Sequence, residues 1–106
     1  MIITTTGSVE GRSVASYLGV CAGESVVGAN IVRDMFASIR DVMGGRSGSY
    51  EKVLRSARED ALETITEAAA ELGADAIIGL SLDYEVVGDG GSMLMMVASG
   101  TAVKLA

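Results

Sequence analysis

The chain has 106 residues, enough to bury one hydrophobic core and too few for two, so we expect a single domain over residues 1–106. Fourteen acidic residues against eight basic ones give a net charge of −6, which repels nucleic acid and anionic membranes and excludes both as expected partners. With one cysteine and no histidine, the chain lacks the usual means of building a zinc site or an acid-base centre by itself.

Nearly half of the residues, 49%, are hydrophobic, and the mean hydropathy of +0.42 is high for a small domain, whose surface should be largely polar. We therefore expect part of the apolar surface to contact another subunit. No stretch is long and apolar enough to cross a membrane, and residues 1–7 lack the basic and apolar regions of a signal peptide. A cytoplasmic protein is the expectation, and a single cysteine, Cys21, agrees with that reducing compartment.

The first quarter of the chain predicts a short edge strand over residues 2–5 and a long strand over residues 13–27. A straight strand of that length would reach about 50 Å, which is longer than an ordinary small domain. We therefore expect a bulge or a bend at Gly19 or Gly23.

Two helices are predicted next. Asn30 is a suitable N-cap for a helix over residues 31–43, and the paired glycines that follow would end it. A longer helix is predicted from its N-cap at Ser49 to Leu72, with Gly73 just after its end. Its apolar residues recur at steps of three and four: Tyr50, Val53, Leu54, Ala57, Ala61, Ile65, Ala68 and Leu72.

The last third of the chain predicts a hairpin of two strands, over residues 76–86 and 92–104, joined by a glycine-rich turn at residues 88–91. In the first of these strands the apolar residues alternate with small or acidic ones: Ile78, Leu80, Leu82, Tyr84 and Val86. The order β-α-α-β-β predicts an α+β fold of two layers, with a mainly antiparallel or mixed sheet and both helices on one face.

One face of the predicted sheet carries no charge. On the last strand this face is formed by Met93, Met95, Val97, Ser99, Thr101 and Val103. The odd-numbered residues from Ala15 to Val27, which we match to the same face, are also uncharged. A face open to water ordinarily carries Lys, Glu or Arg, so we interpret this one as a subunit interface. The alternative is that the parity shifts at a bulge and the face belongs to the core.

Six segments spread over nearly the whole chain carry a resemblance to a known family: residues 28–41 (GANIVRDMFASIRD), 44–51 (GGRSGSYE), 73–79 (GADAIIG), 83–85 (DYE), 91–95 (GSMLM) and 99–103 (SGTAV). Together they resemble the YbjQ-like family of small bacterial proteins. The resemblance implies a dodecin-like subunit that assembles into a ring of five copies. It implies no settled activity, because the family is functionally uncharacterised and is associated with heavy-metal binding without an agreed set of ligands.

Soft-metal ligands are few. Cys21 with the thioethers of Met93, Met95 and Met96 could suit copper(I) if a ring brought several copies together. Methionines on strands are more often packing residues, and a buried cysteine is usually inert, so we assign no metal site. Four carboxylates follow no calcium-loop spacing and are explained by strand ends and turns: Asp75, Asp83, Glu85 and Asp89.

The densest polar feature is an arginine-aspartate pair that recurs seven residues later, followed by an arginine in the interhelical loop. Glycines that free backbone N–H groups, a helix N-terminus and arginine side chains together favour a small anion such as phosphate or a carboxylate. The candidate anion site comprises Arg33, Arg40, Arg46, Ser47, Gly48 and Ser49. The alternative is an ion-paired helix face beside an ordinary turn, where Asp34 and Asp41 neutralise the arginines.

No catalytic residue can be named from this sequence. The leading hypothesis is a homo-oligomeric binding or storage protein whose small ligand, and any cofactor, is unknown and lies between subunits. An enzyme with a carboxylate and arginine site at subunit boundaries is the first alternative. A structural ring that binds a protein partner is the second.

Overall fold

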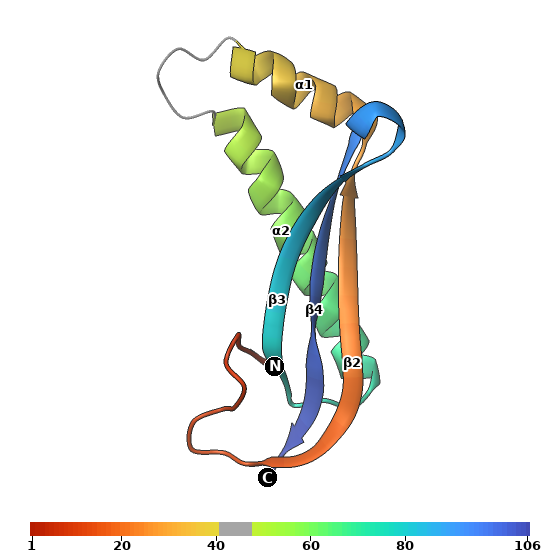
Figure 1. Ribbon diagram of the computed structural model, residues 1–106. Coiled ribbons are helices and arrows are strands. Elements are labelled where there is room, and N and C mark those ends of the chain that lie inside the picture. Colours follow the sequence, from red (N-terminus) through yellow and green to blue (C-terminus); the bar gives the residue numbers. More distant parts are fainter. Residues whose placement is uncertain (41–47) are drawn as a thin grey trace.

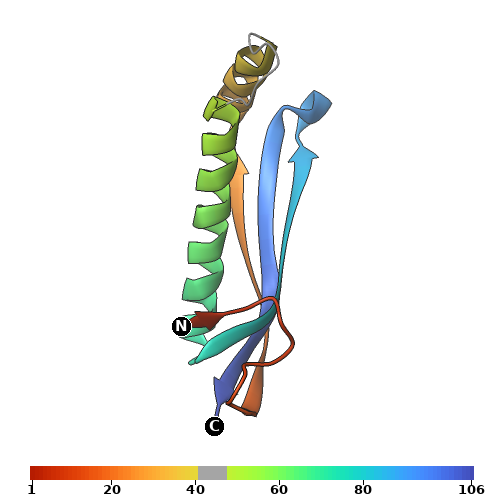
Figure 2. The same cartoon turned by 90° about the vertical axis from the view of Figure 1, so that its left-hand side faces the viewer.

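The computed structural model of the protein describes residues 1–40 and 48–106. The elements in chain order are β1 (Ile2–Ile3), β2 (Val14–Val27), α1 (Ala29–Arg40), α2 (Gly48–Glu71), β3 (Ala76–Val87), the single 3-10 turn η1 (Asp89–Gly91) and β4 (Met93–Leu105). The four strands form one sheet of order β1-β3-β4-β2. In it β4 is antiparallel to both β3 and β2, and β1 runs parallel to β3. Both helices lie on one face of this mixed sheet (Figures 1 and 2). The predicted two-layer α+β organisation is confirmed.

The domain is elongated. Its extents are 52 × 29 × 16 Å and its radius of gyration is 16.8 Å, against about 13 Å for a compact chain of 100 residues. The expected irregularity of β2 lies at Gly19, where the pairing with β4 shifts between Tyr17 and Gly19. The premise behind that prediction was wrong, however, because the domain is itself long enough to hold a strand of 14 residues.

Gly23 has a different role, which is to let α2 approach the sheet. A Cβ atom at position 23 would lie 2.5 Å from the backbone nitrogen of Ile65 and 2.7 Å from the carbonyl oxygen of Ala61. Real side chains do not tolerate such distances from backbone atoms, so only glycine fits here. This contact fixes which face of β2 is turned toward the helices.

The helix α2 ends where the sequence predicts but begins at Gly48, so Ser49 lies inside the helix and is not the predicted N-cap. It runs from Gly48 to Glu71, and the chain then leaves through Gly73. The backbone nitrogen of Ala74 donates to the carbonyl of Ala69 (3.1 Å), and that of Gly73 donates to the carbonyl of Ala70 (2.9 Å). These two bonds form a Schellman motif, which satisfies carbonyls that the helix itself leaves unpaired.

The helix α1 begins two residues earlier than predicted, at Ala29. The backbone nitrogen of Val32 donates to the carbonyl of Gly28, so the helix is already formed at Asn30. The side-chain oxygen of Asn30 accepts a hydrogen bond from Arg33 (2.7 Å) and does not act as the predicted N-cap. The predicted end of this helix, at residue 43, lies outside the described residues.

The main core lies between α2 and the sheet. The fully or nearly buried residues of α2 are Ala57, Ala61, Ile65 and Ala69. They contact buried residues of β2, β3 and β4: Cys21, Val27, Ile77, Leu94, Met96, Ala98 and Ala102. Leu72, predicted to belong to the apolar stripe, is 46% exposed, and Ala69 takes its place in the core. Alanines suit this helix face because Gly23 lets the backbone of α2 come close to the backbone of β2, which leaves little room for larger side chains.

A second, smaller core lies on the opposite face of the sheet, at the end where the chain starts. Its buried residues are Ala76, Ile78, Val103 and Leu105, and Val9 and Val14 pack against them. The irregularity at Gly79 (φ 61°) places Ile78 in this second core and Leu80 against the first. The predicted alternation, which put Ile78 and Leu80 on the same face, is therefore wrong, because the pairing with β4 shifts between Ile78 and Ser81.

Candidate functional site

The sheet face turned away from the helices, here called the open face, contains the half-buried β4 residues that were predicted to form an interface. Cross-strand neighbours point to the same face. Val97 of β4 pairs with Glu24 of β2 on one side and with Asp83 of β3 on the other. The open face therefore carries acidic groups at its centre, and the prediction of a wholly uncharged face was wrong.

The error in that prediction concerned β2. Gly23 faces α2, so the odd-numbered residues Cys21, Gly23 and Val27 lie on the helix side of the sheet. The even-numbered residues Ala22 and Glu24 lie on the open face. The sequence pattern could not show which parity of β2 matches which parity of β4, because the pairing has shifts near Val14 and Gly19. At the far end of the same face, Val103 is fully buried in the second core, as the alternative interpretation held.

Cys21 lies in a packed interior. Its side chain is 5% exposed, and its thiol donates a weak hydrogen bond to the carbonyl oxygen of Gly100 (S···O 3.6 Å). Burial raises the pKa of the Cys21 thiol. A raised pKa disfavours the thiolate that metal binding and nucleophilic chemistry require.

The candidate soft-metal ligands do not come together within one chain. Cys21 lies on the helix side, whereas Met93 and Met95 lie on the open face. Met96 is on the same side as Cys21 and is buried in the main core. Cys21 pairs with Gly100, four residues along β4 from Met96, a separation of about 13 Å. This donor set does not fit a heavy-metal ion bound by a single subunit.

The acidic and thiol groups do not form a metal-binding cluster in the described part of the chain. Over residues 1–40 and 48–106, no three side chains of His, Cys, Asp or Glu are grouped so that they could hold a metal ion. The carboxylates of Glu24 and Asp83, on either side of Val97, therefore do not belong to such a group. No metal site is therefore assigned to the described part of the chain.

We expect the purified protein to carry no stoichiometric zinc. One cysteine and no histidine per chain cannot supply the four nitrogen or sulfur ligands of an ordinary zinc site, even if two subunits contribute. Elemental analysis of wild type and of Cys21→Ser, with Met95→Leu as the control, tests this. One zinc per chain that is lost only in Cys21→Ser would contradict the expectation.

The candidate anion site is only partly described. Arg46 and Ser47 lie outside the described residues, as do the side chains of Arg40 and Ser49. Gly48 is exposed at the first position of α2. Arg33 is exposed on α1 and donates a hydrogen bond to the side-chain oxygen of Asn30. The anion site remains a prediction.

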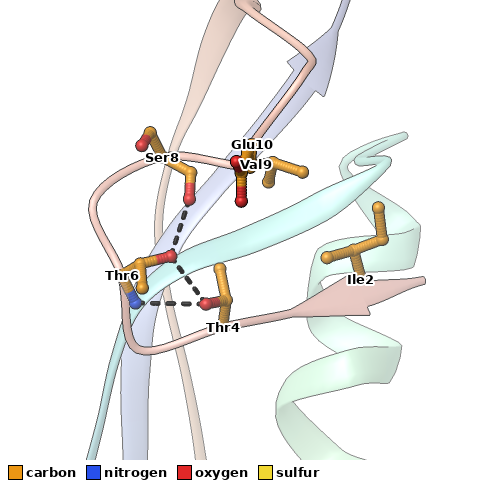
Figure 3. A pocket seen from close by; sticks show the side chains of 6 residues that line it. All are labelled: Ile2, Thr4, Thr6, Ser8, Val9 and Glu10. Carbon is orange, nitrogen blue, oxygen red and sulfur yellow. Dashed lines mark hydrogen bonds between the residues drawn. The ribbon is translucent and has the colours of Figure 1, made fainter.

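A hollow of about 550 Å³ that the sequence did not indicate lies beside the N-terminal segment. Its lining residues are Ile2, Thr4, Thr6, Ser8, Val9 and Glu10 (Figure 3). The threonine hydroxyls bond within the segment: the Oγ1 atoms of Thr4 and Thr6 are 2.7 Å apart, and that of Thr6 donates to the carbonyl of Ser8 (2.6 Å). These bonds account for the shape of the loop and do not require a ligand.

A smaller apolar groove, here called the edge groove, lies beside β2 and both helices and has a volume of about 190 Å³. Its lining includes Ser25, Val27, Ile31, Val53, Ala57 and Asp60. Ile31 is half exposed at its rim. The edge groove is therefore an apolar depression next to β2, which forms one edge of the sheet.

A row of apolar side chains on β3 has no cover from its own helices. Leu82, Tyr84 and Val86 pair with Ala98, Met96 and Leu94, which face the helices. The helix α2 packs mainly against β2 and β4 and leaves this part of β3 uncovered. Tyr84 is 65% exposed and Val86 is 61% exposed. We call these three residues the β3 row.

Asp75 holds the end of the last strand in place. Its carboxylate accepts a hydrogen bond from the backbone nitrogen of Leu105 (2.9 Å) and lies 3.7 Å from the ammonium of Lys104. Arg12 donates to the carbonyl oxygen of Ala106 nearby (3.4 Å). The bond from Leu105, helped by the charges of Lys104 and Arg12, lowers the pKa of Asp75 below its ordinary value.

We expect Asp75→Asn to lower the melting temperature at pH 7, with a difference from wild type that shrinks below about pH 4. The pKa of Asp75 is depressed in the folded protein, so its charge stabilises above the unfolded-state pKa and ceases to do so as pH falls through the folded-state value. The amide can still accept the bond from Leu105, so the variant isolates the charge. Melting curves from pH 2.5 to 7, with exposed Glu63→Gln as control, test this; a pH-independent difference would contradict it.

Within the described residues, no helix is long and apolar enough to cross a membrane. The fold places this chain among small α+β proteins with a mixed four-stranded sheet and two helices. A YbjQ family model, described as putative heavy-metal-binding, matches residues 1–106. The chain therefore belongs to the YbjQ family, as the sequence resemblance indicated.

A solved structure supports the fold assignment. The crystal structure of a DUF74-family protein of unknown function from Pediococcus pentosaceus is similar over 100% of this chain and 98% of its own length, with a TM-score of 0.67. The two sequences are 21% identical. At that identity the likeness shows a shared fold.

Proposed function

We propose that this chain is one subunit of a closed homo-oligomer that binds or stores a small ligand between its subunits. The observation that carries the proposal is the exposed area of the single chain. It amounts to 6511 Å², about 1,000 Å² more than the roughly 5,500 Å² expected for a compact monomer of 10.8 kDa. A stable interface takes about 800 Å² from each partner, so the excess is of the size that assembly removes.

The exposed apolar side chains support the same proposal. Val20 is 83% exposed and Tyr17 is 72% exposed on β2, and Tyr84 and Val86 are largely exposed on β3. Large apolar residues gathered along two strands are costly in water and are typical of surfaces that another subunit covers. A dodecin-like ring of five copies is the form that the family resemblance implies, and it belongs to this proposal.

Native mass spectrometry of gently purified protein tests the proposal, because one spectrum reports both the number of subunits and any retained small molecule or metal. We expect a single closed species, of five copies, with additional mass that dissociates on activation. A monomer at micromolar concentration would contradict the assembly. An oligomer without added mass after several preparations would contradict the storage of a tightly held ligand.

A further inference from the structure

The sheet ends in two edges that differ in shape. The outer edge of β2 and the part of β3 beyond Leu80 pair with no other strand in the described part of the chain (Figure 1). Unpaired strand edges expose backbone donors and acceptors, and proteins usually protect them with proline or several charges. The sequence has no proline, and β2 has a single charged residue, Glu24. The β2 edge is therefore suited to pairing with another strand. The unpaired part of β3 carries two carboxylates, Asp83 and Glu85, but both lie on the open face, so its helix side is apolar.

We propose that the β2 edge of one copy pairs with the β3 edge of the next copy, and that the β3 row of the second copy fills the edge groove of the first. This inference rests on the proposed function, since it specifies how the homo-oligomer is built. The occupant of the groove is thus a second copy of this chain. Contacts between different surfaces, head to tail, close into a ring when the rotation between copies allows it.

The direction of the pairing follows from the topology. Both β2 and β3 are antiparallel to β4, so they run parallel to each other within one chain. A rotation about an axis along the strands keeps these directions, so β2 meets β3 of the next copy as a parallel pair. The shared sheet would then continue around the ring with the helices on its outer side or inner side throughout.

The edge groove and the β3 row also lie at the same level along the strand direction. Ser25 of β2 and Tyr84 of β3 both pair with Met96, and Val27 and Val86 both pair with Leu94. Ser25 and Val27 line the edge groove. A copy related by rotation therefore presents Tyr84 and Val86 level with the groove and on the same helix side of the sheet, apart from the stagger that closure of a twisted sheet introduces.

The chemistry of the two surfaces is complementary. The groove is mainly apolar, with Ile31 and Val53 among its lining, and the β3 row consists of a leucine, a tyrosine and a valine. The carboxylate of Asp60 in the groove is an acceptor that the Tyr84 hydroxyl can use. On the open face the same pairing brings Glu24 toward Asp83 of the next copy, a repulsion between exposed groups that salt screens.

Disulfide trapping tests the arrangement. In a Cys21→Ala background, Ser25→Cys is combined in turn with Leu82→Cys, Tyr84→Cys and Val86→Cys, which scans the register. Within one chain, positions 25 and 84 lie on strands that flank β4, about 10 Å apart, beyond the roughly 7 Å limit for a disulfide. Any disulfide between them must therefore join two copies.

We expect at least one pair to give a ladder of covalent multimers that ends at the size of the ring, while each single-cysteine variant stays uncrosslinked. Dimers from a single-cysteine variant would indicate like-with-like edges and overturn the inference. An intact oligomer without disulfides in all three pairs would overturn it too, while leaving the proposed function standing. A monomeric wild type would overturn both.

A second measurement uses charge. Tyr84→Asp is expected to raise the dissociation constant of the oligomer about thirtyfold, the loss typical of removing a central aromatic contact. Tyr84 is exposed in the single chain, so circular dichroism should show an unchanged fold. The control Leu72→Asp alters an exposed apolar residue just after the end of α2, far from the edge groove, and should leave the constant unchanged. Equal effects of the two variants in analytical ultracentrifugation would contradict the inference.

Discussion

Replacing Gly23 by valine is expected to destabilise the protein by about 3 kcal/mol or more, the upper range for overpacking a well-packed core. Even the first carbon of a side chain at this position would lie 2.5 Å from the nitrogen of Ile65 and 2.7 Å from the oxygen of Ala61. Both atoms belong to the backbone of α2, so no rotamer change can relieve the contact. The helix would have to move away from the sheet and open the main core.

Urea unfolding followed by circular dichroism, at several protein concentrations so that assembly is separated from folding, measures this loss. The control is Ala22→Val, which adds the same kind of side chain at the neighbouring position on the open face, where Ala22 is exposed. We expect the control to stay within about 0.5 kcal/mol of wild type. A Gly23→Val protein as stable as the control would show that α2 does not approach β2 as described.

Truncating Ile65 to alanine is expected to cost about 2 to 5 kcal/mol. Ile65 is fully buried at the centre of the helix-sheet contact, and its neighbours on α2, Ala61 and Ala69, are too small to fill the cavity. The lost apolar contact and the unfilled space both weaken the folded state. Exposed Glu67→Ala on the same helix is the control.

The measurement is the same urea titration. It gives both the midpoint and the slope of the unfolding free energy against urea concentration. A lower midpoint with an unchanged slope indicates lost stability of one cooperative unit. We expect that result for Ile65→Ala and no shift beyond about 0.5 kcal/mol for Glu67→Ala. A loss below about 1 kcal/mol for Ile65→Ala would mean that the core collapses around the smaller side chain.

The candidate soft-metal ligands lie on opposite faces of the sheet, which the sequence could not show. The sequence shows that Cys21, Met93 and Met95 lie on strands and that their chemistry suits soft metals. Whether they meet depends on the faces of two strands that are 65 or more residues apart along the chain. The structure puts the thiol under α2 and these two thioethers on the open face. The family description of heavy-metal binding therefore has no matching donor set in the described part of one subunit.

The sequence by itself determined the order of the elements. The course of α2 and its C-terminal end were predicted, because its apolar residues follow the helical repeat and Gly73 ends it. The closing hairpin was predicted because glycines separate two apolar runs. These features depend on local backbone preferences and on the periodicity of apolar residues. Both are properties of residues that are close together along the chain, so the sequence is enough to predict them.

Only the tertiary structure decided which residues share a face. The irregularities at Gly19 and Gly79 shift the pairing of β2 and β3 with β4, and a one-residue shift moves every later side chain to the other face. For this reason Glu24 lies beside Val97, and Ile78 lies apart from Leu80. The edge groove and the β3 row likewise depend on α2 lying over β2 and β4. This position of α2 is set by the close contact between Gly23 and Ile65, which are 42 residues apart along the chain.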